Sequence, residues 1–142
     1  MKNQFRVLVL LISLVFCQSL YAQSRDSIYM SATCDSIMKG FVDGDYPAAM
    51  KFLKDNSILG NKVDQIKTTI TDEMSRAETA YGKTTGYKFI LERDAGSVVK
   101  KRFYFLLFEK FFVKFDFTWY KTATGWKIVN FNLDENVAEV LN

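Results

Sequence analysis

The spacing of apolar side chains changes at Gly86, and this change divides the chain into a helical half and a strand half. From residue 26 to residue 81, apolar residues recur every three or four positions, which is typical of amphipathic helices. From Gly86 onward the apolar period is two, as in strands that bury one face. Helices followed by strands in this order predict a single α+β domain.

Three helices are expected before Gly86. The first covers residues 26–42 and ends at the glycine of the triplet DGD. The second follows the capping residue Asp45, carries Pro47 in its first turn and runs to about Asp55. Asn61 is expected to cap the third helix, and Gly82 to end it. The third helix has a regular apolar stripe that we expect to face the core: Val63, Ile66, Ile70, Met74, Ala77 and Tyr81.

Four strands are expected after Gly86: Tyr87–Arg93, Val98–Phe108, Phe111–Tyr120 and Trp126–Leu133. Their links are short enough for hairpins, so we predict an antiparallel meander. Residues opposed in a hairpin share a face. The link lengths then place Tyr87 opposite Tyr104, Tyr104 opposite Phe115, and Phe115 opposite Phe131. This register gives the sheet an apolar face toward the helices, with Leu91 on it, and leaves no acidic residue among its positions.

Aromatic residues are concentrated in residues 101–120, where ten of the twenty side chains are aromatic. The predicted register assigns six of them to the helix-facing core. The other four fall on the outer face, where charged residues such as Lys88, Lys114 and Glu92 interrupt them. An exposed apolar face usually marks a contact surface, so we predict a homodimer or an envelope-protein partner there. Coverage by the segment before the first helix or by the C-terminal tail is the main alternative, and carbohydrate stacking is a minor one. The interface candidates are Phe103, Phe105, Phe112, Tyr120, Trp126 and Ile128.

Residues 1–22 have the layout of a secretory signal peptide. Lys2 and Arg6 precede an apolar run that ends at Phe16, and the small residue Ala22 marks the expected cleavage site. That run is too short to span a bilayer. Lipidation at Cys17 is the alternative, although the bulky Phe16 precedes it. We therefore expect export to the periplasm or the extracellular space, a domain formed by residues 23–142, and no transmembrane segment after processing.

Charge and composition narrow the function classes. The chain has 19 basic and 16 acidic side chains, and loss of Lys2 and Arg6 with the signal peptide leaves a net charge of +1. A balanced charge argues against a nucleic-acid surface. The chain has no histidine, so the commonest general base and the usual zinc ligand are missing. We predict neither a metal nor a cofactor. Cys34 would be the only cysteine after processing, and we expect it to be packed rather than reactive.

A small-ligand site is expected where cations meet aromatic rings on the helix-facing side. Lys100, Trp119 and Lys127 fall in one predicted cross-strand row, with Arg102 in the next, and such a group can hold an anion. Basic side chains that simply extend to solvent are the alternative interpretation. The opposed Tyr87 and Tyr104 are candidate hydrogen-bond donors or ordinary core rings. The ligand-binding candidates are Tyr87, Lys100, Arg102, Tyr104, Trp119 and Lys127.

Two segments resemble those of a known superfamily. FVDGDYPAAMKFL (residues 41–53) and GWKIVNFNLDEN (residues 125–136) are similar to the opening and closing segments of secreted bacterial domains of unknown function in the nuclear transport factor 2-like, or cystatin-like, superfamily. The resemblance implies N-terminal helices on a curved, cone-shaped four-stranded meander. It implies no single activity, because the superfamily contains enzymes as well as binding proteins.

The sequence therefore predicts an exported, non-enzymatic domain that binds a partner or a small ligand. The alternative is an isomerase-like or dehydratase-like enzyme whose cone pocket uses Tyr87, Tyr104 and either Asp116 or Arg102. In that case Asp116, in mid-strand, would be a buried base with a raised pKa. An ion pair with Lys88 or Lys114, or simple exposure, is the favoured interpretation of Asp116.

Overall fold

The computed structural model describes residues 25–141, and the predicted signal peptide and Cys17 lie outside them. The chain divides into two units, residues 1–32 and residues 33–142. In the first unit, residues 25–32 are helical, and this helix continues through residue 42 in the second unit. The other elements, all in the second unit, are α2 (Tyr46–Asp55), α3 (Asn61–Tyr81), β1 (Thr84–Ala95), β2 (Val99–Phe108), β3 (Phe112–Thr122), β4 (Gly125–Asp134) and α4 (Ala138–Leu141).

Local sequence signals set the ends of the helices. The Asp45 side chain accepts a hydrogen bond from the backbone N–H of Ala48 and caps α2, with Pro47 in the first turn, as expected. Helix α3 ends at Gly82, also as expected. The expected Asn61 cap is wrong, because Gly60 holds the cap position at φ 54° and no side chain caps α3. A positive φ at this turn favours glycine over any residue with a side chain.

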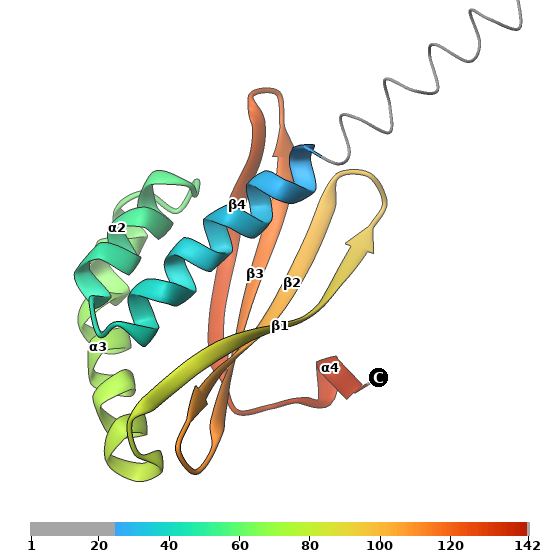
Figure 1. Cartoon of the computed structure of the whole chain (residues 1–142). Helices are drawn as coiled ribbons and strands as arrows, with labels where there is room; N and C mark the ends of the chain where they lie inside the picture. The colour runs from blue at the N-terminus through green and yellow to red at the C-terminus, as the bar shows by residue number, and fades with distance from the viewer. Residues whose placement is uncertain (1–24, 142) are drawn as a thin grey trace, which may run out of the picture. The chain divides into compact units, whose positions relative to one another are not determined.

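The four strands form one antiparallel sheet in the order β1-β2-β3-β4, as Figure 1 shows. The predicted α+β class, with helices followed by a four-stranded meander, is therefore confirmed. The predicted β2–β3 register is also confirmed, since Leu106 pairs with Val113 and Tyr104 with Phe115. These pairs place Tyr104, Leu106, Val113 and Phe115 on the same face of the sheet.

The β1–β2 register differs from the prediction. Tyr87 pairs with Leu106, and Tyr104 pairs with Phe89. A β-bulge between Phe89 and Leu91 then shifts the pairing by one residue. Because side chains alternate along a strand, one extra residue reverses the faces beyond it. Leu91, expected on the helix-facing side, therefore lies on the outer face, and Glu92 lies on the helix-facing side opposite Arg102.

The β3–β4 hairpin is tighter than predicted. Thr122 pairs with Gly125, so the loop has two residues rather than the five expected. The Thr122 hydroxyl donates a hydrogen bond to the carbonyl of Gly125 at 2.6 Å, and Gly125 has φ 116°. The pairing shifts by one residue between Thr118 and Trp119. Because of this shift, Phe131 and Leu133 still lie on the helix-facing side. Phe117 pairs with Phe131, and Trp119 pairs with Ile128.

The concentration of aromatic residues at 101–120 is largely explained by the core of the second unit. Phe115, Phe117 and Trp119 are fully buried on the helix-facing side. Phe41 reaches them from the helix that ends at residue 42, with its ring centroid 4.9 Å from that of Phe115. Burial of each large apolar side chain contributes roughly 1.5–3 kcal/mol to stability. The other buried apolar residues on strands and helices here include Tyr104, Leu106, Phe108, Ile128, Ile37, Met38, Met50, Leu53, Val63 and Met74.

The outer face of the sheet also contains buried residues. Phe103 is 1% exposed, and the ammonium group of Lys101 lies over its ring at 5.0 Å from the centroid. The C-terminal segment reaches this face (Figure 1), because Glu139 of α4 forms ion pairs with Lys101 at 2.9 Å and with Lys114 at 3.5 Å. The C-terminal tail, one of the two covers considered from the sequence, thus contacts part of the outer face.

Candidate functional site

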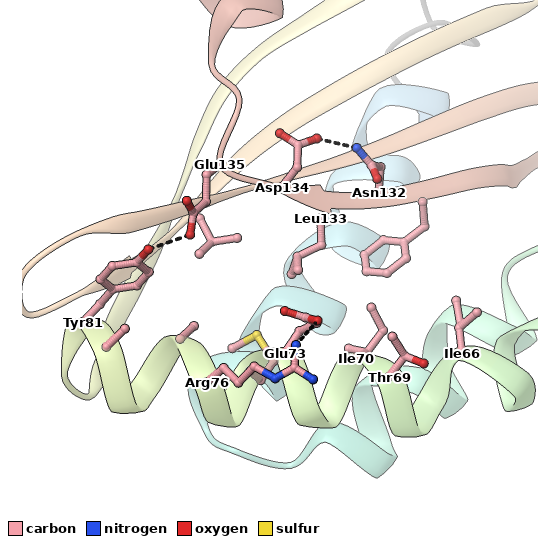
Figure 2. A pocket seen from close by; sticks show the side chains of 15 residues that line it. Ile66, Thr69, Ile70, Glu73, Arg76, Tyr81, Asn132, Leu133, Asp134 and Glu135 are labelled. Atoms are coloured by element: carbon pink, nitrogen blue, oxygen red, sulfur yellow. Dashed lines mark hydrogen bonds and ion pairs between the residues drawn. The ribbon is translucent and has the colours of Figure 1, made fainter.

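A groove of about 710 Å³ lies between α3 and the ends of β3 and β4. Its volume falls within the range of about 300–1,000 Å³ that is typical of small-molecule sites. Most of its lining comes from α3 on one side and β4 with the residue after it on the other (Figure 2). The lining residues are Ile66, Thr69, Ile70, Glu73, Met74, Arg76, Ala77, Ala80, Tyr81, Val113, Phe131, Asn132, Leu133, Asp134 and Glu135.

The floor of the groove is apolar because two regular patterns face each other. On α3, the predicted stripe contributes Ile66, Ile70 and Ala77. On β4, Leu133 points toward α3 (Figure 2), and Phe131 lies on the same face two residues earlier. Phe131 and Leu133 are only half-buried, unlike the β3 residues opposite them, because the groove leaves part of each side chain uncovered. The groove therefore presents apolar surface that another molecule can cover.

Polar groups stand at the edge of the groove. At one end the Tyr81 hydroxyl donates a 2.6 Å hydrogen bond to the carboxylate of Glu135, and this bond raises the pKa of Tyr81 (Figure 2). On α3, Arg76 forms a 2.8 Å ion pair with Glu73. Asp134 points to the other side of β4 (Figure 2), where it pairs with Lys114 at 3.2 Å. A carboxylate bonded to a neutral hydroxyl thus marks one end of an otherwise apolar groove.

The predicted cationic cluster exists in part, but it is an ion-pair network rather than an uncompensated positive surface. Lys100 binds Glu92 at 2.7 Å and Asp94 at 2.8 Å. The buried Arg102 pairs with Glu92 at 3.2 Å and stacks its guanidinium over Phe89 at 4.9 Å from the ring centroid. The expectation of no acidic residue on the helix-facing strands is wrong, because the β1 bulge brings Glu92 to that face. The two basic side chains of this network are matched by two acidic ones, so the network has no net charge.

Cys34, Tyr104 and Trp119 form a buried group beside this network. The Cys34 thiol interacts with both the Tyr104 hydroxyl and the Trp119 indole N–H. Burial raises the pKa of Cys34 to about 12 and raises that of Tyr104. A thiol in this state is a packed side chain rather than a nucleophile. Tyr87 is not opposite Tyr104 in the strand pairing, and burial and a hydrogen bond with Asp35 raise its pKa.

Lys127 lies on the outer face of the sheet rather than on the predicted helix-facing side. It pairs with Tyr120, whereas Trp119 pairs with Lys100 on one side and Ile128 on the other. Residues opposed across strands share a face, so Lys127 lies on the outer face and not in the row of Lys100 and Trp119. The two-residue β3–β4 loop causes this shift.

The six interface candidates do not form one exposed patch. Ile128 is fully buried on the helix-facing side, and Trp126, which pairs with Lys121, shares that face. Phe103 is buried within the chain. Among the candidates, Phe105 and Phe112 stack on each other with centroids 4.4 Å apart and are half-buried, and Tyr120 is 45% exposed. The homodimer therefore stays a prediction, with a smaller surface than expected.

Asp116 lies on the outer face and is 1% exposed. Burial raises its pKa, and Lys101 at 3.4 Å opposes this shift. Asp116 pairs with Phe103 on one side and with Asn132 on the other. It is therefore on the opposite side of the sheet from Tyr104 and Arg102, so the form of the enzyme alternative that uses Asp116 has no single site. Tyr87, Tyr104 and Arg102 share the helix-facing side, and the Tyr87 and Tyr104 ring centroids are 6.3 Å apart.

The sequence patterns did not predict the groove, because they assign the whole α3 stripe to the core. In the structure, the buried positions of α3 are Val63, Ile70 and Met74. The stripe residues Ile66, Ala77 and Tyr81 are only half-buried and line the groove, and the spacing of the stripe does not distinguish the two sets.

Two further observations concern the whole of the described part of the chain. Within residues 25–141, no group of three or more Cys, Asp or Glu side chains is arranged to hold a metal ion. No helix in the same part of the chain combines the length and the apolarity needed to cross a membrane.

Comparison with known proteins gives a distant structural likeness. No protein-family model matches the chain, and no curated protein is significantly similar to it. Among solved structures, the chain is similar to a domain of unknown function with a cystatin-like fold from Nostoc punctiforme. The TM-score is 0.49 and the identity is 12%, over 79% of this chain and 78% of the other. A likeness of this strength supports no functional conclusion, and membership of the nuclear transport factor 2-like superfamily stays a prediction.

Proposed function

We propose that this protein is a binding domain that holds a small, mainly apolar ligand in the groove between α3 and β4. The observation that carries the proposal is the uncovered apolar floor, to which Leu133 and Phe131 contribute from one side and the half-buried Ile66 from the other. Covering apolar surface contributes about 25 cal/mol for each Å² removed from water. The site is proposed to act outside the cytoplasm, because residues 1–22 have the layout of a signal peptide.

Binding, rather than catalysis, is favoured by the chemistry of the groove. Its floor consists of side chains that neither donate nor accept protons. The residues of the enzyme alternative, Tyr87, Tyr104, Arg102 and Asp116, are not among the lining residues. The carboxylates at the edge are held by Tyr81, Arg76 and Lys114. Such an arrangement orients a ligand and supplies no positioned nucleophile.

The test uses N-phenyl-1-naphthylamine, an uncharged dye that fluoresces in apolar surroundings. The protein is expressed from residue 1 and purified as the cell processes it, and its N-terminus is determined by mass spectrometry. We expect saturable binding by the natural protein. Ala77→Phe should weaken it by about tenfold or more, because the ring fills space that the dye would occupy.

Thr79→Phe is the matched control, because Thr79 is exposed on the same helix and does not line the groove. This variant should bind the dye as the natural protein does. Circular dichroism confirms that both variants are folded. Equal binding by the natural protein and Ala77→Phe would contradict the groove as the binding site.

A further inference from the structure

The end of the groove at Tyr81 and Glu135 has the chemistry of a site for an organic cation. The two residues come from different elements, since Tyr81 ends α3 and Glu135 follows β4. Their 2.6 Å hydrogen bond holds the carboxylate beside the aromatic ring (Figure 2). A carboxylate attracts a cation by its charge, and the face of a tyrosine ring attracts quaternary ammonium groups through the cation–π interaction.

The charge balance of the groove lining favours a cation over an anion. Two carboxylates face the groove, those of Glu73 and Glu135, against one cation, Arg76. The third acidic lining residue, Asp134, points its carboxylate to the outer face. Arg76 compensates Glu73, and Lys114 compensates Asp134 from the outer face. Among the described residues, Glu135 has no ion pair and bonds only to the neutral Tyr81 hydroxyl. The uncompensated negative charge therefore lies at one end of the apolar floor.

Two neighbouring aromatic rings pack against Tyr81 at this end of the groove. The Tyr81 ring lies with its centroid 4.9 Å from that of Phe111 and 6.2 Å from that of Phe108. Beside it, Gly82 leaves room for the side chain of Glu109, which a Cβ atom at position 82 would meet at 3.0 Å. This packing means that the ring and its hydroxyl are positioned before any ligand arrives, which lowers the cost of binding.

We propose that the groove binds amphiphiles with a cationic head group, whose head lies at Glu135 and Tyr81 and whose apolar chain lies along the floor between α3 and β4. The inference rests on the proposed function, because it specifies the ligand of the same groove. The ligand class is small, since 710 Å³ is the volume of a small-molecule site. A neutral or anionic amphiphile would gain the floor contacts and lose the contact with the carboxylate.

Displacement of the bound dye by three amphiphiles with the same chain tests this inference. Dodecyltrimethylammonium is the cation, dodecyl maltoside the neutral compound and laurate the anion, each used below its critical micelle concentration. The protein is expressed from residue 1 and purified as processed. We expect the cation to displace the dye at about three- to tenfold lower concentration than the maltoside, with laurate the weakest. The advantage of the cation should shrink in high salt, because exposed charges are screened.

Two variants identify the residue that selects the cation. Glu135→Gln keeps a hydrogen-bond acceptor for Tyr81 and removes the charge, so it should abolish the advantage of the cation over the maltoside. Asp72→Asn is the control, since Asp72 is exposed on α3 outside the groove, and it should behave as the natural protein does.

The outcomes separate the inference from the proposed function. Equal displacement by cation and maltoside would overturn the cationic head group and leave the apolar groove standing. A cation preference that survives Glu135→Gln would overturn the role of Glu135. If the dye does not bind at all, or binds Ala77→Phe equally well, the proposed function itself fails.

Discussion

Removal of the Glu92 carboxylate should destabilise the fold, because two cations depend on it. In Glu92→Gln, the guanidinium of Arg102 loses its 3.2 Å partner and Lys100 loses one of its two carboxylates. The Arg102 side chain is 6% exposed and that of Glu92 is 21% exposed. Breaking a buried ion pair by removing one partner costs about 3–5 kcal/mol, whereas exposed pairs contribute about 0–1 kcal/mol. The partial exposure of Glu92 and the remaining contact of Arg102 with the Phe89 ring reduce the expected cost to about 2–3 kcal/mol.

Urea denaturation measures this cost as the change in the free energy of unfolding. The matched control is Asp43→Asn, which breaks the Lys39–Asp43 pair, whose side chains are 70% and 49% exposed. The control should leave the free energy of unfolding nearly unchanged, because exposed pairs contribute little to stability. The double variant Glu92→Gln/Arg102→Met also removes the buried guanidinium that Glu92 compensated, so it should be more stable than Glu92→Gln alone. A cost for Glu92→Gln no larger than the control, or a double variant as unstable as the sum of both single variants, would refute the reasoning.

Three further predictions concern other parts of the fold. A hydrogen bond from Lys101 lowers the pKa of Glu139 below its ordinary value of 4.5, so the contact stabilises the fold above that value and is lost as the pH falls through the lowered one. In urea titrations, Glu139→Gln should therefore cost about 0.5 kcal/mol at pH 7 and nothing in acid, and an equal cost at both pH values would contradict this. Because burial raises the pKa of Cys34 to about 12, iodoacetamide at pH 8 should label Cys34 only after unfolding, as peptide mapping will show; labelling of the folded protein would contradict the packed thiol. Gly40→Ala should destabilise by about 1 kcal/mol despite the better helix propensity of alanine, because its Cβ would lie 2.9 Å from that of Ala49. Urea denaturation should show that Ala49→Gly rescues it, and no rescue would point to another cause.

The order of elements and the central hairpin could be predicted from the sequence because their signals are local. The change of apolar period at Gly86 separates helices from strands, and Asp45 and Gly82 mark helix ends. The β2–β3 pairing follows from two long aromatic strands whose short connection leaves little freedom in register. Leu106 opposite Val113 was therefore predicted correctly.

The outer hairpins and the site could not be predicted, because both depend on irregularities that the sequence does not mark. The bulge after Phe89 reverses the faces of Leu91 and Glu92, and the two-residue turn after Thr122 moves Ile128 into the core. Simple alternation predicts a cluster of basic residues without acidic neighbours. In the structure, Glu92 lies on the same face and pairs with Lys100 and Arg102. The groove depends on how much of Ile66, Phe131 and Leu133 is left uncovered between α3 and β4, which is a property of tertiary packing rather than of helical spacing.

A titration of the ¹⁵N-labelled protein with dodecyltrimethylammonium, followed by amide chemical shifts, tests the groove most directly. The account predicts saturable shifts that cluster in residues 66–81 and 131–135, with the largest changes at Tyr81 and Glu135. Shifts that cluster instead around Arg102 and Cys34, or on the outer face near Phe105, would contradict the groove between α3 and β4 as the ligand site.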